Sequence, residues 1–290
     1  STATVDGPGS LWTSHGGLNV GNAGGGELIV SNGGQIVILN NRHSGNSPDS
    51  SIGRQVGATG RVVVTGVGSS WTGKTLWVGH EGNGLLEVLD GAVITTTGGG
   101  IGDSSGSTGI ATVSEPGSTW EHLASLYVGN HGNGTLNILG GGHVIAGRDV
   151  NIGEYNSGDN VLTVDGTGST LDVDDEIRIG DQGKGTLNII NSGIVTSGSA
   201  RLGGSGLARG HAAIDGSGSE WSIDGPLEMW PGATLEVHRG GSLHSQSAEI
   251  IGDSVLTVGG AGSSWAISGN VELGGGTINI SDNSRVDIHG

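Results

Sequence analysis

Residues 68–75, GSSWTGKT, match the phosphate-loop pattern G-x-x-x-x-G-K-[ST] at every required position, and the chemistry of that pattern is nucleotide binding. A phosphate loop opens a helix, and the first backbone amides of that helix hold the phosphates. Here the stretch is followed by LWVGHEGNG (76–84), whose alternation and glycines predict a strand and a turn. We therefore expect no nucleotide and no cofactor at this position.

Residues 172–176, DVDDE, place four carboxylates in five positions, and carboxylate oxygens are ligands that Ca²⁺ prefers. In a strand, Asp172, Asp174 and Glu176 would share one face, although a solvated acidic turn has the same composition. The sequence leaves open whether calcium binds there. His80 and His131 stand in equivalent turns, but no third ligand accompanies them, so no metal ligand is assigned.

A glycosidase needs two carboxyl groups about 5–10 Å apart, and Asp165, Asp215 and Glu220 are candidates for such a pair. However, Asp165 and Asp215 occupy the same position of a repeated segment as Asp6, directly before a glycine. A recurrent Asp-Gly pair favours a turn in which the carboxylate accepts backbone N–H bonds. We assign no catalytic residue, and the existence of a cleft with paired acids stays open.

Three aromatic residues, Trp77, Tyr127 and Trp230, stand at positions where a polar residue or a turn is expected. Exposed aromatic rings can stack on the C–H faces of sugar rings, because both surfaces are flat and apolar. These three residues are therefore candidate glycan-stacking residues.

The segment G-S-x-W recurs about every 50 residues and reveals the elements that position all of these side chains. Its last position is occupied by Trp12, Trp71, Trp120, Leu171, Trp221 and Trp265. Since leucine replaces tryptophan once, these side chains are predicted to pack in the core. The chain, a single domain over 1–290, then divides into repeats at about 2–60, 61–109, 110–160, 161–210, 211–254 and 255–290.

Short segments within each repeat, such as VVVTGVGS and TLNI, alternate apolar and polar residues as half-buried strands do. We find no amphipathic pattern of period 3.6, so the chain is predicted to be all-β. Repeats of unequal length fit an open stack better than a closed propeller. We predict a parallel β-helix (solenoid) of six repeats, with roughly two rungs per repeat and ~4.8 Å between rungs.

The composition agrees with this fold and narrows the range of partners. The 63 glycines suit many sharp turns, and the absence of cysteine excludes disulfides and thiolate zinc sites. A formal net charge of −17 opposes binding to nucleic acid. No apolar run approaches the ~20 residues of a transmembrane helix.

The combination of G-S-x-W, L-x-V-G-x-x-G-x-G, L-x-I and x-x-G-G-x-V resembles the repeats in passenger domains of bacterial autotransporters (type V secretion). Similar repeats occur in other large bacterial surface proteins. The second element is intact in residues 18–26, 76–84, 126–134 and 177–185, and shortened in 227–235 and 271–278. The resemblance covers essentially the whole chain. It implies a β-helical rod, secreted or on the extracellular side of the outer membrane, and a translocating barrel domain that is absent from this chain.

The resemblance implies a structural or adhesive passenger fragment, active in adhesion, aggregation or biofilm formation through extended surface contacts. Expected partners are surface glycans or proteins of a host or a bacterium, or a second copy of the chain. We expect no nucleotide and no nucleic acid as partners, and contact with a membrane only through the barrel domain. The alternative is a polysaccharide-degrading enzyme on a β-helix scaffold. An ice-binding surface is disfavoured, because residues 95–97 form the one run of threonines.

Overall fold

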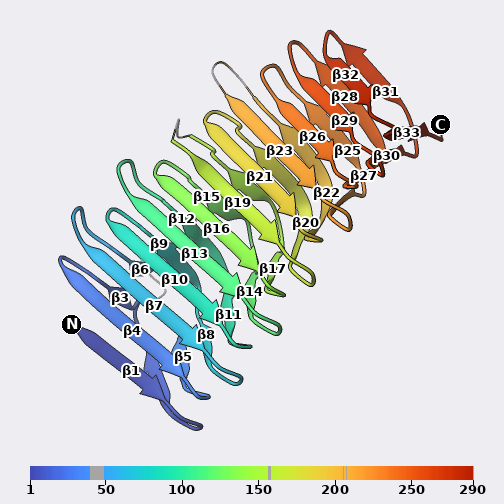
Figure 1. Ribbon diagram of the computed structural model, residues 1–290. Helices are drawn as coiled ribbons and strands as arrows, with labels where there is room; N and C mark the ends of the chain where they lie inside the picture. Colours follow the sequence, from blue (N-terminus) through green and yellow to red (C-terminus); the bar gives the residue numbers. More distant parts are fainter. Residues whose placement is uncertain (40–48, 156–157, 205, 207, 290) are drawn as a thin grey trace.

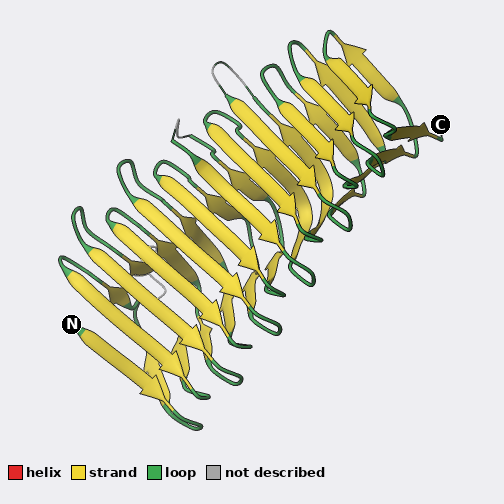
Figure 2. Ribbon diagram, in the orientation of Figure 1, coloured by secondary structure: helices red, strands yellow, loops and turns green. Residues whose placement is uncertain are grey.

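The computed structural model describes residues 1–39, 49–155, 158–204, 206 and 208–289. Over these residues the chain forms strands and turns without a helix, and it winds in one direction from the N-terminus to the C-terminus (Figures 1 and 2). The predicted all-β parallel β-helix is therefore confirmed. It follows that the described part of the chain contains no apolar helix long enough to cross a membrane.

Each turn of the solenoid, here called a rung, contributes one strand to a twelve-stranded parallel sheet, here called the first face (Figure 1). In order, its strands are β1 (Thr2–Asp6), β4 (Gly25–Ser31), β7 (Thr59–Thr65), β10 (Asn83–Leu89), β13 (Thr108–Ser114), β16 (Asn133–Leu139), β19 (Asn160–Asp165), β21 (Lys184–Ile190), β23 (Arg209–Asp215), β26 (Thr234–His238), β29 (Val255–Gly259) and β32 (Thr277–Ser281). In the regular central part, successive strands begin about 25 residues apart.

The remaining strands of each rung form a second and a third face. The second face comprises β2 (Leu11–Ser14), β5 (Gln35–Ile38), β8 (Ser70–Thr72), β11 (Val93–Thr96), β14 (Thr119–His122), β17 (His143–Ala146), β24 (Glu220–Ile223), β27 (Ser242–Ser245), β30 (Ser264–Ile267) and β33 (Arg285–Ile288). The third face comprises β3 (Asn19–Val20), β6 (Ser50–Ile52), β9 (Thr75–Val78), β12 (Gly98–Ile101), β15 (Leu126–Val128), β18 (Val150–Ile152), β25 (Pro226–Met229), β28 (Ser247–Ile251) and β31 (Val271–Gly274). Two longer strands, β20 (Thr170–Ile179) and β22 (Ile194–Leu202), run through both faces and join them into one sheet.

The G-S-x-W segments enter strands β2, β8, β14, β20, β24 and β30, which lie on every second rung. One repeat therefore spans two rungs, as predicted. Since each rung makes contact only with its two neighbours, the stability of the rod is approximately a sum over rungs and the interfaces between them.

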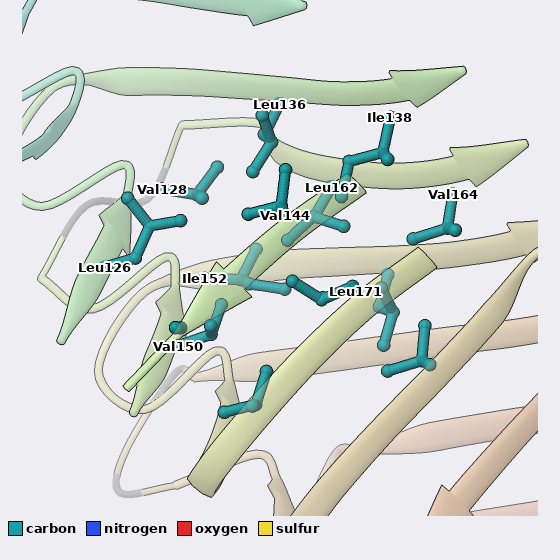
Figure 3. Packing of buried hydrophobic residues seen from close by; sticks show 14 of the residues in the cluster. Leu126, Val128, Leu136, Ile138, Val144, Val150, Ile152, Leu162, Val164 and Leu171 are labelled. Atoms are coloured by element: carbon teal, nitrogen blue, oxygen red, sulfur yellow. The ribbon is translucent and has the colours of Figure 1, made fainter. Parts of the chain in front are cut away.

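The core runs through the space that the three faces enclose (Figure 3). In β16 the side chains alternate, with Leu136 and Ile138 fully buried and Asn137 half-buried. Similar side chains stack on successive rungs, since Leu136 pairs with Leu162 and Ile138 with Val164. Each aliphatic side chain buried in this way stabilises the fold by about 1.5–3 kcal/mol relative to exposure.

The corner between the third and first faces is built from glycine, because the backbones of neighbouring rungs approach closely there. Gly79 has a φ of +73°, and a Cβ on it would lie 2.3 Å from the carbonyl oxygen of Thr108. Where the strands of the two neighbouring rungs have Gly134 and Gly185, β19 begins with Asn160. Its amide accepts a hydrogen bond from the Gly134 N–H (2.9 Å) and donates one to the Lys184 carbonyl (3.0 Å), so a buried polar side chain replaces the backbone contact.

The serine of G-S-x-W links neighbouring rungs at the corner between the first and second faces. Ser219 is fully buried, accepts a hydrogen bond from the Ser192 N–H (3.1 Å) and donates one to the Asp215 carbonyl (2.7 Å). Amides of the preceding rung donate in the same way to Ser69, Ser118, Ser169 and Ser263. The serine thus satisfies a backbone donor that the turn would otherwise leave unpaired.

The repeated tryptophans fill the core, as predicted. At the last position of G-S-x-W, five side chains are exposed by 1% or less: Trp71, Trp120, Leu171, Trp221 and Trp265. The indole N–H of Trp221 donates to the Ser197 hydroxyl at 3.1 Å, so the polar edge of the buried ring is satisfied. Trp12 is 37% exposed, because the first rung has a neighbouring rung on one side only.

Candidate functional site

The stretch that matches a phosphate loop, residues 68–75, contains strand β8 and the corner that leads to β9. Strand β9 begins at Thr75, where a phosphate loop would open a helix. The Lys74 carbonyl accepts the backbone N–H groups of Thr97 (2.6 Å) and Gly98 (2.8 Å) from the next rung. The backbone of this stretch therefore holds two rungs together and does not present the amides of a helix N-terminus to an anion.

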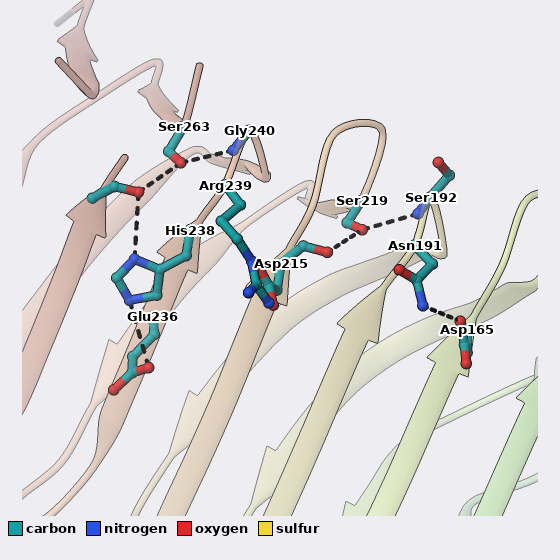
Figure 4. A network of polar contacts seen from close by, with 11 residues as sticks. Asp165, Asn191, Ser192, Asp215, Ser219, Glu236, His238, Arg239, Gly240 and Ser263 are labelled. Atoms are coloured by element: carbon teal, nitrogen blue, oxygen red, sulfur yellow. Dashed lines mark hydrogen bonds and ion pairs between the residues drawn. The ribbon is translucent and has the colours of Figure 1, made fainter. Parts of the chain in front are cut away.

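Each of the acids considered for glycoside hydrolysis lies beside a partner on the following rung. Asp165 and Asp215 lie at the same edge of the first face, two rungs apart, because both pair with Ile190 on β21. Glu220 lies beyond the turn on the second face, where Nε2 of His244 is 3.9 Å away. Each aspartate instead binds a residue of the following rung (Figure 4).

These aspartates fix the turns at the end of each first-face strand. Asp165 accepts a hydrogen bond from the side chain of Asn191 (2.8 Å), and Asp215 forms an ion pair with Arg239 (Figure 4). Asn191 and Arg239 both have positive φ, 51° and 49°. The carboxylate therefore holds a residue whose left-handed backbone is unfavourable by itself.

Asp6 follows the same rule and corrects one detail of the sequence-based prediction. Its carboxylate accepts hydrogen bonds from Ser31 (2.6 Å) and Asn32 (2.8 Å), which lower the pKa of Asp6. The predicted turn role is confirmed, but the prediction of backbone N–H donors is wrong, because the donors are side chains. They lie on the next rung, about 25 residues away, where local turn rules do not reach.

The carboxylates of residues 172–176 do not share one face, and they have different partners. The pairing of β20 with β22 shifts by one residue within this stretch, so Asp172 lies on the second face and Glu176 on the third. Asp172 accepts a hydrogen bond from Thr196 (2.7 Å), and Glu176 pairs with Arg178 (2.5 Å). Across the described ranges, no three His, Asp or Glu side chains converge on a position for a metal ion.

At the centre of the third face, the residue whose side chain points outward changes in type along the rod. We call this series the third-face ladder, and on successive rungs it reads Trp77, Gly100, Tyr127, Asn151, Arg178, Arg201, Glu228, Glu249 and Glu272. Neighbouring members are ~4.8 Å apart at the backbone. The ladder is therefore aromatic near its start, where only Asn19 and Ser51 precede Trp77, cationic in the middle and acidic at the last rungs.

Trp77 lies across the next rung because Gly100 has no side chain. Its Cζ3 atom is 3.3 Å from the place where a Cβ of Gly100 would stand. The half-buried indole stacks beside the imidazole of His80, with 6.2 Å between centroids and 28° between planes. Nδ1 of His80 is 2.8 Å from Asp103, which also accepts a hydrogen bond from Asn130 (3.0 Å). The indole thus rests on the sheet within a rim of polar groups.

A second aromatic surface lies two to three rungs further along the rod. Tyr155 is 47% exposed, and its ring stacks on His131 with 4.8 Å between centroids and 12° between planes. A hydrogen bond from Tyr155 to Glu154 raises the pKa of the Tyr155 hydroxyl. Burial raises the pKa of the Glu154 carboxyl, and burial followed by the charge of Glu154 raises the pKa of Tyr127.

Trp230 forms a third aromatic surface at a corner position that is glycine in the preceding rung, Gly203. Its indole is 37% exposed. The guanidinium of Arg201 lies 5.9 Å from the ring centroid and pairs with Asp181 (2.9 Å). The indole N–H donates to Glu228 (3.4 Å), so contacts on two sides hold the ring in place.

Charges on the third-face ladder are compensated in the middle but not at the acidic end. Arg178 pairs with Asp149 (3.1 Å) and Glu176 (2.5 Å). Burial by itself would lower the pKa of Arg178, but the two acids together leave it raised. In the described part of the chain, Glu249 and Glu272 stack on successive rungs without an ion pair.

The sequence predicted Trp77, Tyr127 and Trp230 as candidate glycan-stacking residues, and it did not identify Tyr155. The structure places Trp77 and Tyr127 on the same ladder two rungs apart, with Trp230 four rungs beyond Tyr127. Tyr155 occupies a turn position that is Ser and then His in the two preceding rungs. Because the residue at this position differs from rung to rung, the repeat gave no signal for Tyr155.

Comparison with known proteins relates the chain to others through its fold. No protein-family model matches the chain, and no curated protein matches it. A solved structure with a similar fold is the hyper-glycosylated TibA55-350 fragment, an autotransporter passenger fragment whose glycosylation is catalysed by TibC. The TM-score is 0.52 at 18% sequence identity, over 99% of this chain and 87% of that chain. The resemblance to autotransporter passenger repeats is therefore confirmed at the level of the fold.

Proposed function

We propose that this chain is a cell-surface or secreted rod of the bacterial autotransporter type, which mediates adhesion or aggregation through extended surface contacts. The observation that carries the proposal is a rod of stacked rungs whose outward side chains form long, in-register ladders. The TibA fragment, a passenger fragment with the same fold, supports the assignment to the bacterial surface.

The first face has the chemistry expected of a surface that makes many weak contacts. Its central outward ladder includes Thr112, Asn137, Thr163 and Asn188, all half-buried, uncharged and directly paired rung to rung. Hydroxyl and amide groups donate and accept hydrogen bonds at a smaller desolvation cost than charged groups. A row of such groups binds by accumulation, because linked weak contacts raise the effective affinity.

A polysaccharide-degrading enzyme is the alternative, and the arrangement of the acids disfavours it. Asp165 and Asp215 are held by turn residues, and Glu220 lies on another face. A glycosidase would require two free carboxyl groups facing one cleft.

The proposal is tested by coating beads with the purified chain and measuring bead clustering and retention on bacterial and host cells. We expect clustering, retention, or both, in physiological salt. A variant with Thr112→Glu and Thr163→Glu should cluster less, because the added carboxylates increase the repulsion between the first faces of two copies that each already carry a net charge of −17. Failure of the coated beads both to cluster and to bind any cell would contradict the proposal.

A further inference from the structure

Three pairs of rings or ring-like groups lie along one side of the rod, on the third face and in the turns that follow it. We call them the aromatic stations: Trp77 with His80, His131 with Tyr155, and Trp230 with Arg201. They stand two to three rungs apart, or ~10–15 Å along the rod. Their spacing makes this side of the rod a row of flat surfaces separated by polar groups.

The rings of the second and third stations are partly exposed to the solvent, and Trp77 at the first station is half-buried. The Trp77 indole rests on the backbone of Gly100, so the sheet covers one face of the ring. Tyr155 remains 47% exposed while stacked on His131, and Trp230 remains 37% exposed beside Arg201. Fixed, partly exposed rings lose little conformational entropy on binding, which makes them effective anchors.

Two polar side chains beside the second station each have one oxygen without a partner among the described residues. These atoms, Oδ1 of Asn130 and Oε2 of Glu154, are buried and accept no hydrogen bond there. Both residues belong to turns that stack on one another, since Glu154 follows Asn130 on the next rung. A ligand rich in hydroxyl groups can supply, after small side-chain rotations, the donors that these oxygens lack.

The charge around the stations decides which sugars fit. The carboxylates of Asp103, Asp149, Glu154 and Asp181 line this side of the rod, and the two arginines of the third-face ladder are already paired, Arg178 with Asp149 and Arg201 with Asp181. The chain as a whole carries a net charge of −17. Sugars that bear carboxylate or sulfate groups would be repelled. Neutral pyranoses with equatorial substituents suit the stations best, because they expose flat C–H faces to aromatic rings.

We propose that the aromatic stations bind an extended neutral polysaccharide of equatorially linked pyranoses, lying parallel to the axis of the rod. This inference rests on the proposed adhesive function and names the partner class of one face. Trp77 and Tyr155 stack on the sugar rings at the first two stations, and Trp230 extends the site for longer chains. Tyr127 is half-buried on the same ladder as Trp77, two rungs away.

The test is calorimetric titration of the purified chain with cello- and chito-oligosaccharides from the mono- to the hexasaccharide. We expect affinity to rise with chain length, because longer chains reach a second station. Trp77→Ala and Tyr155→Ala should each weaken hexasaccharide binding by roughly three- to tenfold, and Trp230→Ala should weaken it less. Oligogalacturonates, which are anionic, should not bind.

Val67→Ala serves as the control, since Val67 is 84% exposed in the turn after β7, on a different corner of the rod. It should leave the affinity unchanged, and circular dichroism should show each variant folded. Lack of binding by every neutral oligosaccharide would overturn the inference. Binding that none of the three aromatic variants weakens would also overturn it.

The bead assay separates this inference from the proposed function. If beads adhere to cells but the chain binds no neutral oligosaccharide, the polysaccharide site is wrong and adhesion depends on another partner, such as a protein. If the chain binds the hexasaccharide but beads neither cluster nor adhere, the site stands and the adhesive function is wrong.

Discussion

Two regions of the rod differ in how often the same residue types recur. One is the corner between the first and second faces, and the other is the third face. At the corner the same residue types return on every second rung, as Ser219 and Trp221 illustrate. On the outward side of the third face few residues return, and Trp77 on that face and Tyr155 and Trp230 in the turns that follow it each occur once. Recurrence marks what every rung needs in order to stack, and departure from recurrence marks positions that stacking does not determine.

The physical difference between the two regions lies in burial. A corner serine or tryptophan is fully buried and satisfies a donor or fills volume in its own rung and the next. A third-face aromatic ring is partly exposed and contacts its neighbours mainly at its edge or on one face. Substitutions at the corner should therefore act on stability, and substitutions on the third face on binding.

The largest effect is expected for Trp221→Ala at the corner, which should lower the free energy of unfolding by about 3–5 kcal/mol through loss of a fully buried indole. Urea unfolding followed by circular dichroism measures it. Trp221→Leu is the matched control, because Leu171 fills the same position of another repeat, and it should cost clearly less. If both variants lost the same free energy of unfolding, the loss would not depend on the volume of the buried side chain, and the packing role would be refuted.

A buried histidine at the end of β14, next to the repeated Trp120, makes the second face sensitive to acid. Nε2 of His122 donates to the Ser125 carbonyl (3.0 Å), so Nδ1 must accept the hydroxyl hydrogen of Thr96 (2.9 Å). The Trp120 indole N–H donates to the Thr96 oxygen (3.0 Å) and completes this hydrogen-bond network. This network needs a neutral imidazole, and burial lowers the pKa of His122 from its ordinary value of 6.5 to about 4.

Because the folded-state pKa is lowered, the stabilisation from neutral His122 is fully present above pH 6.5. It is lost as the pH falls from 6.5 to about 4. The loss should approach about 3 kcal/mol, from ~1.4 kcal/mol per pKa unit. Urea unfolding at several pH values measures it. His122→Gln, which can accept from Thr96 and donate to Ser125, should flatten this part of the profile, and an unchanged profile would exclude His122 as its source.

Ser219→Ala should lower the free energy of unfolding by about 1–2 kcal/mol, because it leaves the Ser192 N–H without its partner. Amide hydrogen exchange should show the fastest gain at Ser192 and neighbouring turns. Ser222→Ala is the control, since Ser222 lies half-buried on the outward side of β24. A comparable loss in both variants would show that the corner serine has no special role.

The smallest effect is expected on the acidic end of the third-face ladder. Glu249→Gln should raise the thermal midpoint slightly, because Glu249 stands directly between Glu228 and Glu272. The gain should fall as salt is added, since screening weakens repulsion between exposed charges. A gain that is independent of salt would point to a cause other than charge.

The fold could be predicted from the sequence because its determinants are local and repeated. Alternation over a few residues identified the strands, and the return of G-S-x-W identified the pairing of rungs. Contacts between rungs could not be predicted, since Asp6 binds Asn32 and His122 binds Thr96 across about 25 residues. Trp77 and Trp230 were found because they break the pattern, whereas Tyr155 was missed because its turn varies in every rung.

The corner should determine stability and the third face should determine binding. Measuring hexasaccharide affinity and the free energy of unfolding for two folded variants, Trp77→Ala and Ser219→Ala, tests this difference directly. We expect Trp77→Ala to lose several-fold in hexasaccharide affinity with a small change in the free energy of unfolding. Ser219→Ala should lose stability and keep the affinity of the parent chain. Parallel losses of stability and affinity in both variants would contradict the account.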